Sequence, residues 1–111
     1  MNWSILTTSE ELAALLKKSF INPQLIFKHS TRCSISRVIK TRLEKSAIPP
    51  FIDFYYLDLL AYSSLSNTIS QQLDVYHASP QVLLIKDGQC IYDESQLAVY
   101  MNDIVAQVAF D

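Results

Sequence analysis

Short apolar segments of strand length alternate along this sequence with segments in which apolar residues recur at helical spacing. The runs "QLIFKHS" (24–30) and "FIDFYYLDLL" (51–60) have the pattern of buried strands. Between them, residues 34–46 place an apolar residue at every fourth position from Ile35 to Leu43, with basic side chains on the other face. Strands joined by a helix form parallel crossovers, so this alternation predicts an α/β fold.

The remaining segments extend the pattern in both directions. A helix is predicted over residues 10–19, after Thr8, and another opens near Ser66 and runs to Tyr76. Asp87-Gly88 lies between two short β-type runs within residues 81–94 and predicts a hairpin, and a last helix is predicted over residues 95–110. The predicted order is αβαβαββα, which gives a four-stranded mixed sheet with helices on both faces. Several small α/β folds share this order.

Size and charge limit the classes of function. A chain of 111 residues is expected to form a single domain, residues 1–111, and 50% hydrophobic residues with 18% charged residues favour a compact fold. A net charge of −2 gives no support for a nucleic-acid or membrane-surface partner, because either would favour a basic protein. The apolar runs are too short to span a bilayer, and the start "MNWSILTTSEEL" has no signal-type segment, so a cytoplasmic location is expected.

Cys33 is the first candidate for chemistry, because it lies where a predicted strand gives way to a predicted helix in "KHSTRCSISRVI". Backbone N–H groups at the start of a helix favour a negative charge, and the thiolate is the nucleophilic form of cysteine. Arg32 and His29 are expected to act in the same direction. The alternative is a cysteine that packs as a small hydrophobic residue. The position favours a reactive thiol, and a packing role for Cys33 stays open as the alternative.

Other polar residues have weaker signals. Pro80, in "ASPQVLLIKDG", precedes a buried strand, and either a cis or a trans bond after Ser79 fits the local sequence. Cys90 is predicted to be a packing or edge residue of the hairpin. The histidines His29 and His77 are too far apart in sequence to form a close-spaced ligand pair, so no metal site is predicted.

The segments "FKHSTRCSIS" and "VYHASPQVLLIKDG", in this order, resemble the monothiol bacilliredoxins of the YtxJ type, a branch of the thioredoxin-like proteins. The resemblance extends from about Leu12 to Tyr92. It implies a thioredoxin-like three-layer α/β/α fold with Cys33 as the redox-active thiol. It also implies that Ser36 stands in the place of a resolving cysteine, and that Ser79-Pro80 forms a cis-proline loop facing Cys33.

The resemblance further implies an activity. The family is associated with removing a low-molecular-weight thiol, bacillithiol, from protein cysteines. The expected partners are therefore thiolated client proteins and a small thiol as co-substrate, with no bound cofactor. Substrate-binding or activating roles are expected around Cys33 and on the proline loop, for Thr31, Arg32, Ser34, Ser36, Ser79 and Pro80.

Two departures from the family and its relatives bear on the site. The family usually has proline directly after the cysteine, where this chain has Ser34. Dithiol thioredoxins have a buried acid in the strand before the site, and "LIFKHS" has none, so their type of proton relay is not expected. The Ser36 hydroxyl could donate a hydrogen bond to the thiolate or serve the first helical turn, and we favour the second interpretation.

Two alternatives to an enzyme stay open at this point. The chain could be a thioredoxin-fold module that binds proteins and carries an inert cysteine. It could also be a sensor whose thiol is modified without turnover.

Overall fold

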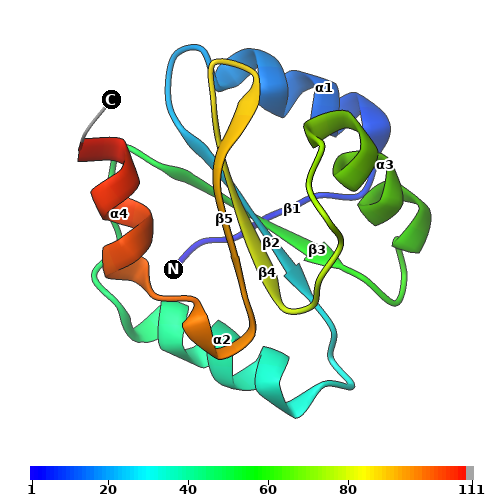
Figure 1. The fold of residues 1–111 in the computed structure, drawn as a ribbon, viewed down its shortest axis with the longest axis vertical. Coiled ribbons are helices and arrows are strands. Elements are labelled where there is room, and N and C mark those ends of the chain that lie inside the picture. The colour runs from blue at the N-terminus through cyan, green and yellow to red at the C-terminus, as the bar shows by residue number, and fades with distance from the viewer. Residues whose placement is uncertain (110–111) are drawn as a thin grey trace.

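The computed structural model describes residues 1–109, which form a five-stranded sheet with helices on both faces (Figure 1). The strands are β1 (Ser4–Ile5), β2 (Gln24–His29), β3 (Asp53–Asp58), β4 (Gln81–Lys86) and β5 (Gln89–Ser95). The α-helices are α1 (Ser9–Lys18), α2 (Ser34–Lys45), α3 (Ser63–Leu73) and α4 (Met101–Ala109), and a 3-10 helix, η1, covers Gln96–Ala98. None of the helices in the described residues is long and apolar enough to cross a membrane.

The strand order is β1-β3-β2-β4-β5. Strands β1, β3 and β2 are parallel to one another, whereas β4 is antiparallel to β2 and β5 is antiparallel to β4. The mixed sheet is therefore confirmed, but the predicted number of four strands is wrong. The additional strand is β1, which adds to the edge of β3 by pairing Ser4 with Tyr55 and Ile5 with Tyr56. Two residues are too few to show the alternation that identifies a strand in a sequence.

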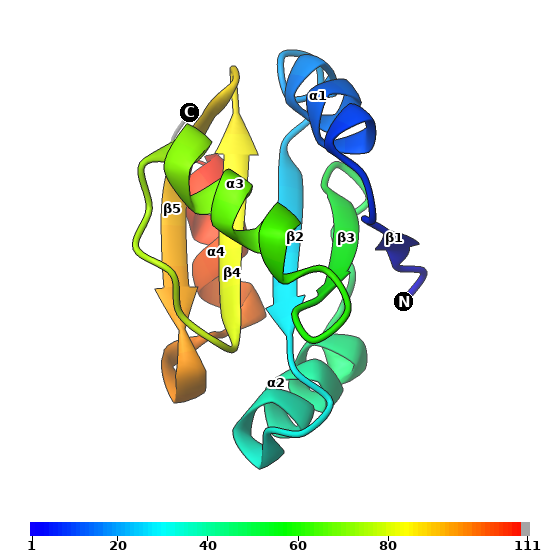
Figure 2. The ribbon, with the colours of Figure 1, turned by 90° about the vertical axis from the view of Figure 1, so that its right-hand side faces the viewer.

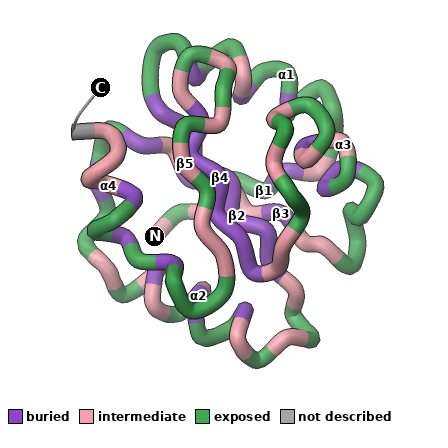
Figure 3. The backbone as a smooth tube through the Cα atoms, viewed as in Figure 1, coloured by how far each residue is buried: buried purple, intermediate pink, exposed green. Residues whose placement is uncertain are grey.

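The sheet separates two apolar cores. Figure 2 shows α3 in front of the strands and α4 behind them, and α1 lies on the side of α3 while α2 lies on the side of α4 (Figure 1). One core joins Ile39 and Leu43 of α2 to Phe27 of β2. The other joins Leu12 of α1 and Ile69 of α3 to the opposite face of the sheet. The central strands are consequently buried on both faces (Figure 3), and all six residues of β2 are buried, the polar ones included.

Helix ends follow local capping chemistry. Thr8 caps α1: its hydroxyl accepts a hydrogen bond from the Glu11 N–H at 3.1 Å, and the Glu11 carboxylate accepts one from the Thr8 N–H at 3.0 Å. This confirms the first predicted helix. Helix α3 begins at Ser63, before the predicted start at Ser66. It ends before Tyr76 because Asp74 adopts the left-handed conformation of a C-terminal cap, with φ of 55°.

The predicted hairpin is confirmed, because Asp87 and Gly88 alone connect β4 to β5 and both have positive φ, 54° and 77°. Strand β5 is longer than expected and pairs with β4 as far as Ser95. The last helix therefore begins at Met101 and not at residue 95, since Ser95 belongs to β5 and the next three residues form η1. Its predicted end at Phe110 lies outside the described residues.

Candidate active site

Cys33 occupies the N-cap position of α2, four residues after the end of β2. Its backbone is extended, with φ of −101° and ψ of 120°, and its carbonyl accepts the first helical hydrogen bond from the Arg37 N–H at 3.2 Å. The half-buried thiol forms no capping hydrogen bond, and the first turn of α2 has no acidic residue. The opening turn of α2 therefore has no carboxylate of its own near the Cys33 sulfur.

Ser36 lies one turn further along α2 and is completely buried. Its Oγ accepts a hydrogen bond from the Ser30 N–H at 3.0 Å and lies 2.6 Å from Nδ1 of His29. The hydroxyl thus joins the first turn of α2 to the end of β2. This differs from our interpretation of the sequence, in which the hydroxyl served its own helix. When Nδ1 of His29 is the acceptor, the only proton of this hydroxyl is used in that bond.

His29, the last residue of β2, is buried, with 2% of its surface exposed. Its ring contacts those of Phe27 and Tyr56, at centroid distances of 5.5 and 5.4 Å, and these two rings also contact each other. Burial lowers the pKa of His29, the positive charge of Lys40 lowers it further, and Asp58 opposes the shift. The neutral imidazole is therefore favoured at neutral pH, and His29 does not provide the positive charge that we expected from the sequence.

The proline loop reaches the same end of the sheet. Lys28 of β2 pairs with Gln81 of β4, so one more step of this antiparallel register places Pro80 opposite His29. The Ser79–Pro80 peptide bond is cis, Pro80 is buried, and its carbonyl accepts a hydrogen bond from the Gln96 N–H at 2.9 Å. The buried Ser79 hydroxyl has no hydrogen-bond partner among the described residues.

The remaining candidate residues lie on the surface around Cys33, and two residues that were not candidates lie near them. Thr31, Arg32 and Ser34 are exposed and surround Cys33 in sequence. Two further cations, Arg37 and Lys40, line a pocket of about 370 Å³ together with residues that include Thr31 and His29. We did not assign Arg37 or Lys40 to the site from the sequence. The available signal was their position on the basic face of the predicted helix that follows Cys33.

Cys90 lies far from this site. It pairs with Ile85, which in turn pairs with Gln24 at the start of β2, whereas Cys33 follows the end of β2. Gln24 and His29, the two ends of β2, are five residues apart, so the level of Cys90 lies about 17 Å from the end of β2 that leads to Cys33, at ~3.3 Å per residue. Burial raises the pKa of the Cys90 thiol to about 11, and its Sγ donates to the Tyr92 carbonyl at 3.3 Å. Cys90 packs against the core of α1 and α3, as predicted for a packing residue.

Lys28 is an unexpected buried charge next to the site in sequence. Its side chain is completely buried, and Nζ donates to the Ser66 carbonyl at 3.1 Å and to the Ser70 hydroxyl at 2.9 Å. Burial lowers its pKa to about 8. Since its partners belong to α3, Lys28 points to the face opposite α2, so it does not contact the surroundings of Ser36.

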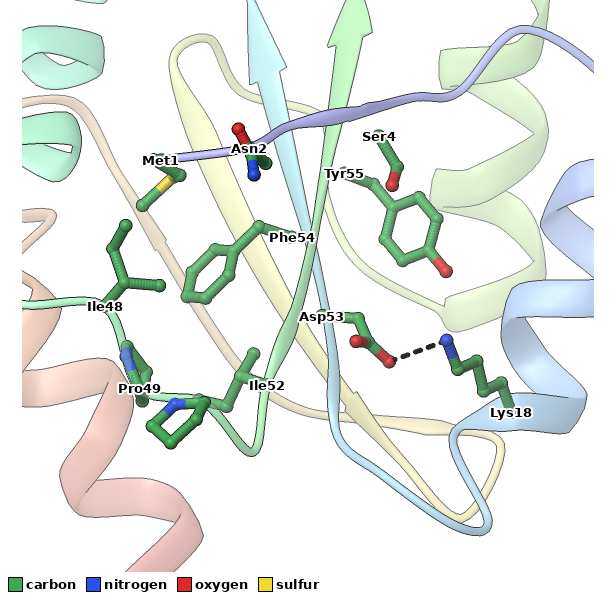
Figure 4. Close-up of a pocket in the computed structure, with 11 residues that line it drawn as sticks. Met1, Asn2, Ser4, Lys18, Ile48, Pro49, Ile52, Asp53, Phe54 and Tyr55 are labelled. Atoms are coloured by element: carbon green, nitrogen blue, oxygen red, sulfur yellow. Dashed lines mark ion pairs between the residues drawn. The ribbon is translucent and has the colours of Figure 1, made fainter.

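Within residues 1–109, no group of three or more His, Cys, Asp or Glu side chains is placed to hold a metal ion. A further pocket contains the ion pair between Lys18 and Asp53, at 3.2 Å, beside Tyr55 and Phe54 (Figure 4). Asp53 begins β3 and pairs with Gln24, so this pocket lies at the end of the sheet remote from Cys33.

Comparisons with known proteins agree with this architecture. A protein with a thioredoxin fold superposes with a TM-score of 0.82 at 20% identity, over 94% of this chain and 91% of that one. Thioredoxin from Trypanosoma brucei brucei gives a TM-score of 0.80 at 13% identity, over 99% and 93% of the two chains. Thioredoxin from Fasciola hepatica gives 0.76 at 19% identity, over 96% and 98%.

These superpositions establish the fold, which is the thioredoxin fold expected from the sequence. The sequence itself matches the family described as monothiol bacilliredoxin BrxC over residues 4–104. This match includes Cys33, the whole of α2 and the proline loop. The chain belongs to the monothiol bacilliredoxin family.

Proposed function

We propose that this protein is a thiol–disulfide oxidoreductase that removes a low-molecular-weight thiol from protein mixed disulfides through Cys33. The observation that supports this most directly is the placement of the two thiols. Cys33 lies half-buried at the start of α2, at the end of the sheet where Pro80 lies, and Cys90 lies about 17 Å away along the strands. A disulfide requires Cα atoms within about 7 Å, so the folded chain offers Cys33 no internal partner.

The exchange then proceeds in two balanced steps. The Cys33 thiolate attacks the small-thiol sulfur of the mixed disulfide, a new S–S bond forms at Cys33, and the client protein leaves as a thiolate that takes up a proton. In the second step another small-thiol thiolate attacks the adduct. It forms a symmetrical small disulfide and releases Cys33 as a thiolate. The net reductant is the pool of small thiol, or a separate reductase that acts on the same adduct.

The surrounding residues have supporting roles in this proposal. Ser36 holds the first turn of α2 against β2 through Ser30 and His29, which fixes the backbone on both sides of Cys33. The resemblance implies that the backbone before Pro80 pairs with the client segment carrying the mixed disulfide. Thr31, Arg32 and Ser34 are exposed around the thiol, where a client would contact them.

The family name favours bacillithiol as the small thiol, and thiolated proteins as the clients. The decisive experiment uses one client with a single mixed disulfide, prepared separately with bacillithiol, glutathione and coenzyme A. Each is incubated with wild type, Cys33→Ser or Cys90→Ser, and release of the client thiol is measured together with the intact mass of the protein.

We expect wild type and Cys90→Ser to release the client thiol and to gain one adduct, and Cys33→Ser to do neither. With excess small thiol, release should exceed one equivalent per protein. An adduct that forms without turnover would identify a sensor. The absence of any adduct at Cys33, under conditions that modify a free peptide cysteine, would leave a binding module and refute the proposal.

A further inference from the structure

Two buried polar side chains, Lys28 and Gln81, have no part in the exchange steps described above. They are paired across β2 and β4 on the face of the sheet opposite α2, and both are completely or almost completely buried. A neighbouring pair on the same face, Ile26 and Leu83, belongs to the apolar core. Because buried polar groups are costly unless they are hydrogen-bonded, the partners of Lys28 and Gln81 indicate what this pair stabilises.

The Gln81 side chain holds the segment that leads into Pro80. Its Nε2 donates to the Tyr76 carbonyl at 2.9 Å, and its Oε1 accepts a hydrogen bond from the Ala78 N–H at 3.4 Å. Residues 75–78 form no helix or strand, so a side-chain amide bonds the backbone groups at Tyr76 and Ala78 that no neighbouring strand pairs. The first residue of β4 therefore positions the backbone of the loop before it.

Lys28 holds the same segment through α3, which Figure 2 shows in front of β2 and β4. Its Nζ donates to the Ser66 carbonyl at 3.1 Å and to the Ser70 hydroxyl at 2.9 Å. The Ser66 Oγ lies 3.3 Å from Nδ1 of His77, which belongs to the loop. Burial, and then the positive charge of Lys28, lower the pKa of His77, which is consistent with a short distance between the two side chains.

The loop held by these contacts ends at the cis bond between Ser79 and Pro80. The Ser79 hydroxyl is buried without a hydrogen-bond partner in residues 1–109, so it contributes no hydrogen bond that holds the loop. A loop whose backbone pairs with an incoming segment binds more tightly when its conformation is already fixed, because ordering it on binding costs free energy. The contacts of Lys28 and Gln81 supply this order in the free protein.

We propose that Lys28 and Gln81 are positioning residues for client binding, which hold residues 76–79 in the conformation that pairs with the client segment carrying the mixed disulfide. The inference rests on the proposed function of Cys33, and it assigns residues that act on the protein client and not on the sulfur. A small disulfide has no peptide segment to pair with the loop. Its reaction with Cys33 is therefore independent of these two side chains.

The test compares two substrates: a client protein with a single mixed disulfide of the small thiol that supports the fastest release, and bis(2-hydroxyethyl) disulfide. Release of the client thiol under turnover gives KM and kcat, and intact mass gives the second-order rate constant for the Cys33 adduct with the small disulfide. Lys28→Met and Gln81→Met remove the two polar groups. Gln24→Met is the matched control, because Gln24 is equally buried on the same face at the other end of β2, where its amide donates to Asp53.

We expect Lys28→Met and Gln81→Met to raise KM for the client about fivefold, the scale of ordering one side chain on binding, and to change kcat and the small-disulfide rate constant by less than about twofold. Gln24→Met should keep all three values of wild type. Ser66→Ala removes the hydroxyl that faces His77 and keeps the carbonyl that Lys28 binds. It should also raise KM, with little further effect when added to Lys28→Met, because both changes act through the same contact.

A parallel fall in the rates with the client and with the small disulfide would overturn the inference, because the two residues would then act on Cys33. An unchanged KM in Lys28→Met and Ser66→Ala would overturn it as well, and these two variants decide the matter if Gln81→Met does not fold. An equal rise of KM in Gln24→Met would show a general loss of structure and also overturn it. Failure of the proposed function has a different result, since wild type itself would then release no client thiol.

Discussion

Lys28 provides a quantitative test, because a completely buried ammonium group is costly and its cost depends on pH. Burial lowers its pKa from 10.5 to about 8. A shift of roughly 2.5 units at ~1.4 kcal/mol per unit corresponds to about 3 kcal/mol of destabilisation at pH 7, where the lysine is charged in both the folded and the unfolded states. Replacement by methionine, a chain of similar length without the charge, removes this cost.

The replacement also removes two hydrogen bonds. The Ser66 carbonyl and the Ser70 hydroxyl each lose a donor, at about 1 kcal/mol apiece. We therefore expect Lys28→Met to be more stable than wild type at pH 7, by about 1 kcal/mol in the free energy of unfolding.

The difference in stability between Lys28→Met and wild type changes sign at high pH. Between pH 8 and 10.5 the folded protein has released the Lys28 proton while the unfolded chain still binds it, so the stability of wild type rises with pH and that of the variant lacks this contribution. By pH 11 wild type should be the more stable protein, by about 2 kcal/mol. Tyrosines and Cys90 titrate in both proteins, so their contributions cancel in the difference.

Urea unfolding at intervals from pH 7 to 11, under reducing conditions, measures this difference. Lys45→Met controls for the removal of one positive charge at the surface. A difference between wild type and Lys28→Met that stays constant over this range would refute the reasoning. So would a variant that loses several kcal/mol at pH 7, because the hydrogen bonds of Nζ would then outweigh its desolvation.

Three further substitutions test the description of the site and the hairpin. Ser36→Cys should allow an internal disulfide with Cys33, detected after mild oxidation as a loss of two hydrogen atoms in intact mass; an unchanged mass would contradict the assigned position of Ser36. Ser34→Pro should leave stability unchanged or raise it by up to about 1 kcal/mol, because Cys33 already has the extended backbone that a following proline requires and Ser34 is the first helical residue. A loss measured by urea unfolding would show that the local backbone differs. Gly88→Ala should cost about 1–2 kcal/mol, since φ is +77° and the added Cβ would lie 3.0 Å from the Phe20 ring; a neutral result would contradict the turn geometry.

Much of the fold could be predicted because its signals are local. The amphipathic pattern of α2 and the Asp87-Gly88 turn each depend on a few neighbouring residues, and both predictions are confirmed. Strand β1 could not be identified in this way, since its two residues are strands only because the edge of β3 is available to pair with them. The start of α4 was misplaced for a similar reason: pairing of Ser95 with Gln81 extends β5 into the predicted helix.

For the candidate site, too, local features could be predicted and long-range contacts could not. The position of Cys33 at a strand-to-helix junction could be predicted from the neighbouring sequence. The contact between Ser36 and His29 could not, because each residue was assigned to a separate element and only the turn between them brings the side chains to 2.6 Å. Burial of Lys28 was also unpredicted, since it depends on α3 covering that face of β2. The roles of Ser79 and Pro80 remain predictions.

The separation of Cys33 from Cys90 also determines how the protein would respond to peroxide. A sulfenic acid on a dithiol site is rescued when the neighbouring thiol displaces its hydroxyl, which stops the oxidation at a reversible stage. With about 17 Å of sheet between its two thiols, this chain has no such internal rescue. A sulfenic acid at Cys33 would need a thiol from solution, and that thiol would convert it into the same adduct that forms in each round of exchange. Small-thiol concentration would then determine both how fast the protein works and how long its nucleophile survives.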